Sequence, residues 1–126
     1  MALHHLTLSQ RHYPGDVVVV GVSGELDVAT APKLDDYLIG LASTGHHRLV
    51  LNAARLTFCD ASGIHVLIRA GRRVERQHGW LRLTAVSPRL RRILTILALL
   101  AVLPAFDDVS HAVLAADPQV PDLAVG

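Results

Sequence analysis

Apolar and polar residues follow one another along the chain in a way that predicts strands and helices in turn. Leu3, Leu6 and Leu8 alternate loosely with polar residues, and the Tyr-Pro-Gly-Asp sequence at 13–16 is a strong turn signal. Five valines within residues 17–22, without polar alternation, indicate a strand that is covered on both faces. We therefore predict that the chain opens with a β-hairpin.

The segment after the hairpin predicts a helix that crosses back to a third strand. Thr30 can cap this helix, and Pro32 falls in its first turn, where a missing N–H costs little. Gly45 ends the helix, and residues 49–51 form a short buried strand. One apolar helical face is formed by Leu34, Tyr37, Leu38 and Leu41.

The rest of the chain repeats this alternation. A second helix is expected from Ser62 or Gly63 to about His78, with Gly79 as its stop. Its buried stripe is Ile64, Leu67, Ile68, Gly71 and Val74. The elements that follow are a strand over 80–86, a helix opened by Ser87 and Pro88 with apolar Leu90, Ile93, Leu94 and Leu97, a strand over 103–106, and a helix from Asp107 or Asp108 through Leu114.

A hairpin followed by alternating helices and strands is typical of a single α/β domain. We expect a mixed β-sheet of about five strands flanked by about four helices. The domain is predicted to span residues 1–116, and residues 117–126, which include Pro118 and Pro121, are predicted to form a flexible tail.

Composition and charge narrow the class of protein. The 126 residues carry a net charge of +1 and 51% hydrophobic side chains, enough for one core and without the basic footprint of a nucleic-acid binder. The only cysteine, Cys59, excludes an internal disulfide and a cysteine metal cage. Because we find neither a signal peptide nor an apolar run long enough to span a membrane, we expect a cytoplasmic protein without a membrane partner.

Motifs for metal, nucleotide or cofactor binding are weak. The eight histidines include the neighbours His4-His5 and His46-His47, but adjacent residues of a strand face opposite sides. The Gly-Val-Ser-Gly sequence at 21–24 lacks both the GxGxxG spacing and the GK[ST] ending of phosphate-binding loops. We predict no metal and no cofactor.

Ser62, in the Asp-Ala-Ser-Gly-Ile stretch at 60–64, allows three interpretations. A hydrolase nucleophile would use His65 as its base, but the first glycine of a GxSxG elbow is missing and no carboxylate is evidently placed to orient the base, so we expect no enzyme. A helix cap would satisfy a first-turn amide. A phosphorylation site would face free amides at the positive end of the helix dipole, and this is compatible with a cap.

Two motifs, in this order and spacing, resemble the STAS family of bacterial anti-sigma factor antagonists. The first is Gly-Glu-Leu-Asp-Val-Ala-Thr-Ala-Pro-Lys-Leu at 24–34, and the second is Asp-Ala-Ser-Gly-Ile at 60–64. The resemblance extends from about Leu6 to Ala115. It implies a single STAS domain that acts by partner switching in transcription regulation, without binding nucleic acid directly.

The resemblance also implies a regulatory cycle. The unphosphorylated protein would bind an anti-sigma factor that is also a serine kinase, and so release a sigma factor. The kinase would then phosphorylate the serine before the motif glycine, which matches Ser62, and a serine phosphatase would reset the switch. Asp27, Asp60 and Gly63 would shape the loop around this hydroxyl. Ala61 stands where a second serine or threonine is common, so Ser62 is the only acceptor in the loop.

The expected partner surface combines this loop with one edge of the second helix. Residues at three- and four-residue steps share an edge, so a row of arginines could pair with carboxylates of the anti-sigma factor. The expected contact residues are Glu25, Asp27, Thr30, Ser62, His65, Arg69, Arg72, Arg73 and Arg76. The alternatives are a solvated helix face and a STAS interaction module of another regulatory or stress-sensing complex. The apolar segment 94–104 also allows a homodimer.

Overall fold

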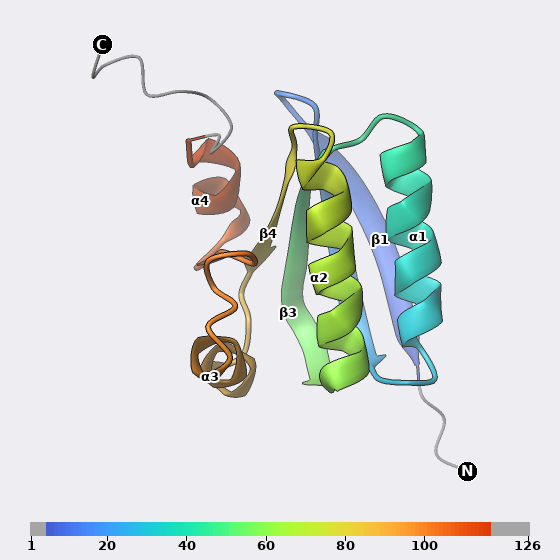
Figure 1. Ribbon diagram of the computed structural model, residues 1–126, viewed down its shortest axis with the longest axis vertical. Coiled ribbons are helices and arrows are strands. Elements are labelled where there is room, and N and C mark those ends of the chain that lie inside the picture. The colour runs from blue at the N-terminus through green and yellow to red at the C-terminus, as the bar shows by residue number, and fades with distance from the viewer. Residues whose placement is uncertain (1–4, 117–126) are drawn as a thin grey trace.

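The computed structural model describes residues 5–116, which form a five-stranded sheet with helices on both faces (Figure 1). In sheet order the strands are β1 (Leu6–Tyr13), β2 (Val17–Leu26), β3 (Arg48–Cys59), β4 (Trp80–Thr84) and β5 (Ala105–Phe106). β1 and β2 pair in an antiparallel hairpin, and the other neighbours pair in parallel. The predicted α/β class, mixed sheet and opening hairpin are confirmed, whereas the predicted tail over 117–126 lies outside the described residues.

The helices divide between the two faces of the sheet. α1 (Ala31–Ser43), α2 (Ala61–Glu75) and α3 (Pro88–Ile96) share one apolar core with Val18 and Val20 of β2, and α4 (Val109–Leu114) packs near Val19 on the other face (Figure 1). The valine run is therefore buried on both sides, as predicted for a central strand. Within residues 5–116 no helix combines the length and the apolar character needed to cross a bilayer.

The end of α2 differs from the prediction. The helix stops at Glu75, about three residues early, and His78 takes the left-handed conformation with a φ of 64°. Gly79 is needed for a different reason, because a Cβ built on it would lie 1.8 Å from the carbonyl oxygen of His47. The backbone of Gly79 thus passes directly against the chain that leads into β3.

The apolar face of α3 is shorter than predicted. Leu90 and Leu94 are buried, but Leu97 is the C-cap and is 55% exposed, so it does not extend the buried face of the helix. The physical reason is the turn at Ala98, whose φ of 56° takes the chain out of the helix. Leu103, which is fully buried, packs instead against Gly71 of α2.

A buried arginine on β4 holds the carboxyl end of α4. The Arg82 guanidinium donates hydrogen bonds to the carbonyl oxygens of Ala112 at 2.8 Å and Ala115 at 3.0 Å. It also lies over the Trp80 ring, 3.8 Å from the centroid. These bonds satisfy carbonyls that a helix end leaves without partners, so they fix a six-residue helix that would be marginal alone.

Candidate functional site

The turn between β2 and α1 is held from within by Asp27 and Thr30. The Asp27 carboxylate accepts hydrogen bonds from the N–H groups of Ala29 at 2.9 Å and Thr30 at 3.1 Å. The Thr30 hydroxyl accepts from the Asp27 N–H at 3.0 Å and donates to the Glu25 carbonyl oxygen at 2.7 Å. Because these bonds close on one another, the turn has a defined shape, and Val28 at its tip is 74% exposed.

Two expectations for this turn change. Thr30 does not cap α1 with its side chain, so that prediction is wrong; its backbone is helical, and its hydroxyl is used inside the turn. The Asp27 carboxylate instead bonds the amides of Ala29 and Thr30, which precede α1, because a carboxylate readily accepts from backbone amides two and three residues on. Asp27 and Thr30 are only 4% and 7% exposed, which leaves them little surface for a partner. They shape the turn, while Glu25 remains partly exposed.

The turn between β3 and α2 is organised by Asp60, and Ser62 is not the cap that we predicted. Asp60 has extended φ and ψ of −103° and −171°, and its carboxylate accepts from the N–H groups of Ser62 at 2.9 Å and Gly63 at 3.3 Å. Its own N–H donates to the carbonyl oxygen of Leu26 at 3.1 Å. Asp60, and not Ser62, is the N-cap because its negative charge also interacts favourably with the positive end of the helix dipole.

Ser62 is therefore the second residue of α2, with its backbone amide anchored and its hydroxyl unused. Within residues 5–116 the hydroxyl makes no hydrogen bond, and the side chain is partly exposed. His65 lies near it, on the wall of the same hollow, but no hydrogen bond joins the two side chains. The hydroxyl is thus available to another molecule without a base bonded to it.

Gly63 faces the core rather than an approaching protein. A Cβ at this position would lie 2.5 Å from Leu26 Cγ and 2.9 Å from Cys59 Sγ. Gly63 therefore has a packing role, in addition to the loop-shaping role that we expected. Its lack of a side chain lets the first turn of α2 pack directly on the end of β2.

Cys59 is an unreactive thiol at the end of β3. Burial, together with the neighbouring Asp60 carboxylate, raises its pKa to about 11. The thiol is therefore protonated at neutral pH, and nucleophiles and metal ligands require the thiolate.

One open hollow lies between the first turns of α1 and α2, and we call it the Ser62 hollow. Arg69 on its wall faces Asp35 of α1 with an N–O distance of 3.6 Å, and the two side chains are 53% and 22% exposed. Because Arg69 is more than half exposed, solvent screens the pair, which contributes only about 0–1 kcal/mol, and Arg69 can exchange partners. The side chains that line the hollow are Val28, Ala31, Pro32, Asp35, Asp36, Ser62, His65, Val66 and Arg69.

The other predicted arginines lie beyond the Ser62 hollow. Arg72 and Arg76 are exposed, in line with an outer edge of α2. Arg73 is half-buried, and one of its guanidinium nitrogens is covered without a hydrogen bond in the described part of the chain. The row of arginines therefore exists, but its members differ in how much charge they present to solvent.

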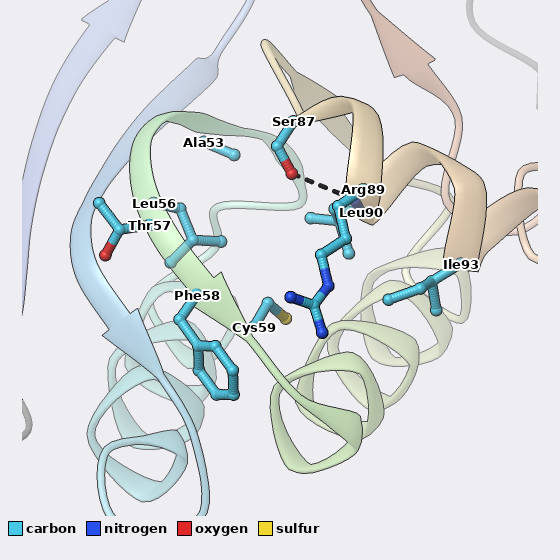
Figure 2. A pocket seen from close by; sticks show the side chains of 9 residues that line it. All are labelled: Ala53, Leu56, Thr57, Phe58, Cys59, Ser87, Arg89, Leu90 and Ile93. Carbon is cyan, nitrogen blue, oxygen red and sulfur yellow. Dashed lines mark hydrogen bonds between the residues drawn. The ribbon is translucent and has the colours of Figure 1, made fainter.

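A second hollow, which we call the Phe58 hollow, lies between the end of β3 and α3 (Figure 2). Sequence reasoning missed it, because its two walls come from segments far apart in the chain. Its lining residues are Ala53, Leu56, Thr57, Phe58, Cys59, Ser87, Arg89, Leu90 and Ile93. Together the two hollows flank the Asp60 turn. Among residues 5–116 no three histidine, cysteine, aspartate or glutamate side chains are grouped to hold a metal ion.

Known proteins resemble this chain in both sequence and structure. A sequence model described as the STAS domain matches residues 9–112. An anti-sigma-B factor antagonist of Staphylococcus epidermidis is 30% identical over 84 residues, which cover 67% of this chain and 78% of the relative. A crystal structure of an anti-sigma factor antagonist from Mycobacterium paratuberculosis has a TM-score of 0.78 at 25% identity, covering 86% of this chain and 92% of that one. The Bacillus cell fate determinant SpoIIAA in its phosphorylated form has a TM-score of 0.68 at 21% identity, covering 85% and 96%.

Proposed function

The chain belongs to the STAS domain family, and from this premise we propose that it is an anti-sigma factor antagonist switched by phosphorylation of Ser62. The unphosphorylated form binds an anti-sigma factor that is also a serine kinase, and so releases a sigma factor. Phosphorylation separates the pair, and a serine phosphatase restores binding. The antagonist named among the relatives and the solved phosphorylated form of SpoIIAA support this proposal.

The unused hydroxyl of Ser62 is the observation that carries the proposal. Its backbone amide is held by Asp60, so the side chain leaves a fixed point of the helix and lies on the wall of an open hollow. A kinase needs an accessible hydroxyl in a defined backbone, and a phosphate here would displace no existing bond of that hydroxyl. The fold can therefore persist in both states.

The charge of the phosphate would not be absorbed by the helix start. The Asp60 carboxylate already occupies the Ser62 and Gly63 amides, so our expectation that a phosphate would meet free amides does not hold for these two. A phosphate adds about −1.5 to −2 charges beside this carboxylate. Arg69 is the arginine that lines the hollow, and it already faces Asp35.

This added charge explains how binding would be lost. We propose that the partner carries carboxylates that meet Arg69, Arg72, Arg73 and Arg76, and that His65 and Glu25 belong to the same contact surface. Like charges brought together in an interface cost several kcal/mol, and about 1.4 kcal/mol is tenfold in affinity. One phosphate could therefore weaken the complex by about a hundredfold or more without any refolding.

Calorimetric titration with an anti-sigma factor kinase encoded in the same genome tests the switch. Wild type and Ser62→Ala should bind alike, whereas Ser62→Asp should bind at least tenfold more weakly. Ser110→Asp is a matched control, because Ser110 is the second residue of α4 and also follows an aspartate cap, while α4 packs on the opposite face of the sheet from α2. It adds the same charge away from the Ser62 hollow and should bind like wild type.

The same kinase provides a second measurement. It should incorporate phosphate into wild type and not into Ser62→Ala. Stoichiometric labelling of Ser62→Ala, or equal weakening by Ser62→Asp and Ser110→Asp, would remove the assignment. Tight binding to a partner without a kinase fold would favour the alternative of a STAS interaction module outside sigma factor control.

A further inference from the structure

The start of α2 has a second open flank, which the contact residues proposed above do not use. The Phe58 hollow is walled by the apolar side chains of Leu56 and Leu90, with Ile93 beside them. Phe58 at its edge is 42% exposed, although a ring of this size is usually more deeply buried. Figure 2 shows these side chains converging from β3 and α3 on one small space.

Arg89 gives this flank an uncompensated positive charge. Figure 2 shows its side chain extending from α3 over the hollow toward Cys59. In the described part of the chain Arg89 has no ion pair, and residues 76–106 contain no aspartate or glutamate at all. Arg89 therefore has no carboxylate in its own segment with which it could form an ion pair.

Each flank of the Asp60 turn carries one exposed apolar side chain and one arginine. The Ser62 hollow combines exposed Val28 with Arg69, and the Phe58 hollow combines exposed Phe58 with Arg89. Cys59 lines one hollow and Ser62 the other, so a single turn of chain separates them. Exposed aromatic and arginine side chains in such a setting are the types that dominate binding energy at protein interfaces.

The size of the Phe58 hollow decides what it can hold. Its volume is about 40 Å³, whereas small-molecule sites usually measure about 300–1,000 Å³. A cofactor or metabolite therefore does not fit. The end of one side chain does fit, and the adjacent guanidinium would suit a carboxylate beside it.

We propose that the anti-sigma factor grips both flanks of the Asp60 turn, with an apolar side chain in the Phe58 hollow and a carboxylate on Arg89. This rests on the proposed function and extends its contact surface from the end of β2 and α2 to α3. The partner segment is defined by its chemistry: an apolar residue next to aspartate or glutamate. A second copy of this chain suits the site less well, because Arg89, Arg91 and Arg92 of each copy would meet in a region without carboxylates.

Matched variants on one helix test the proposal. Arg89→Ala should weaken binding of the anti-sigma factor kinase about tenfold or more, the effect of about 1.4 kcal/mol. Arg92→Ala removes the same charge from an exposed position of α3 that does not line the hollow, and should bind like wild type. Phe58→Ser should weaken binding comparably, and Ile96→Ser, at a position 73% exposed and outside the hollow, should not.

The outcomes separate this inference from the proposed function. Suppose that wild type binds the kinase and Ser62→Asp binds it more weakly. If Arg89→Ala then has the same affinity as Arg92→Ala, and Phe58→Ser the same affinity as Ile96→Ser, the proposed switch stands and the second flank is wrong. If wild type fails to bind the kinase, both fall together. A melting temperature equal to that of wild type shows that a variant is folded. A dimer in light scattering that Phe58→Ser converts to a monomer would make a second copy the occupant and overturn the proposal.

Discussion

Two helices of this protein begin in the same way, yet only one of them begins at a surface suited to a partner. Asp60 and Asp108 both cap a helix from an extended backbone conformation, and each carboxylate accepts a first-turn amide. Ser62 and Ser110 follow as the second helical residue in each case. An Asp-x-Ser sequence at a helix start is therefore not a functional site in itself.

The difference lies in what surrounds each start. The α2 start is joined to β2 by the bond from the Asp60 N–H to the Leu26 carbonyl oxygen and by the close packing of Gly63, and it has a hollow on each flank. The α4 start is exposed, and Asp108 is paired with His111 of its own first turn at 2.8 Å. Tertiary packing thus turns a common capping pattern into a positioned hydroxyl.

Replacing Gly63 should produce the largest effect on stability. Gly63→Ala places a methyl group against buried Leu26 and Cys59, and overpacking of this kind costs about 1–3 kcal/mol. We expect the free energy of unfolding, measured in urea, to fall by that amount. Binding of the anti-sigma factor should weaken as well, because the Asp60 turn must shift.

Gly40→Ala is the control for this change. Gly40 lies in α1, and a Cβ built there has no neighbour within 4 Å. Alanine in a helix interior is favoured over glycine by about 0.5–1 kcal/mol, so this variant should be more stable than wild type. Equal effects at the two positions would show that helix propensity, and not packing on Leu26, governs Gly63.

Removing the two capping carboxylates should lower the free energy of unfolding by less than Gly63→Ala does, and by unequal amounts. Asp60→Ala leaves the Ser62 and Gly63 amides without their acceptor and should cost about 1 kcal/mol in urea unfolding. Asp108→Ala should cost less, because its helix is also held by Arg82 at the other end. Asp60→Ser keeps an acceptor and should recover part of the loss. A larger effect at Asp108 would contradict the view that α2 is the integrated start.

Local patterns in the sequence were enough for most elements but not for the site. The valine run predicted a doubly covered strand, and Ser87 with Pro88 predicted the start of α3, where the Ser87 hydroxyl accepts a hydrogen bond from the Leu90 N–H at 3.1 Å. In the stretch at 60–64 we predicted Ser62 as the cap, whereas the structure uses Asp60, whose position depends on its backbone bond to Leu26, a contact between distant segments. The Phe58 hollow depends on β3 meeting α3, which no periodicity in either segment indicates.

Acidification should affect the starts of α2 and α4 differently, and this difference is the smallest of the expected effects. The backbone N–H of His111 donates to the Asp108 carboxylate and, with the His111 side chain, holds the Asp108 pKa below its usual 3.8. A lowered folded-state pKa means that this contribution is present above the unfolded pKa and is lost as pH falls through the folded-state value. The protection of the His111 amide, relative to its intrinsic exchange rate, should therefore fall as pH drops through the Asp108 midpoint, and a carboxyl carbon titration should place that midpoint below 3.8. His111→Ala should raise that midpoint only in part, since the backbone bond remains.

The Gly63 amide lies in a turn that is also fixed by packing on Leu26 and Cys59, so it should keep its protection to lower pH than the His111 amide. Loss of protection at the same pH for both amides would mean that the caps alone, and not the packing around α2, hold the Asp60 turn in place.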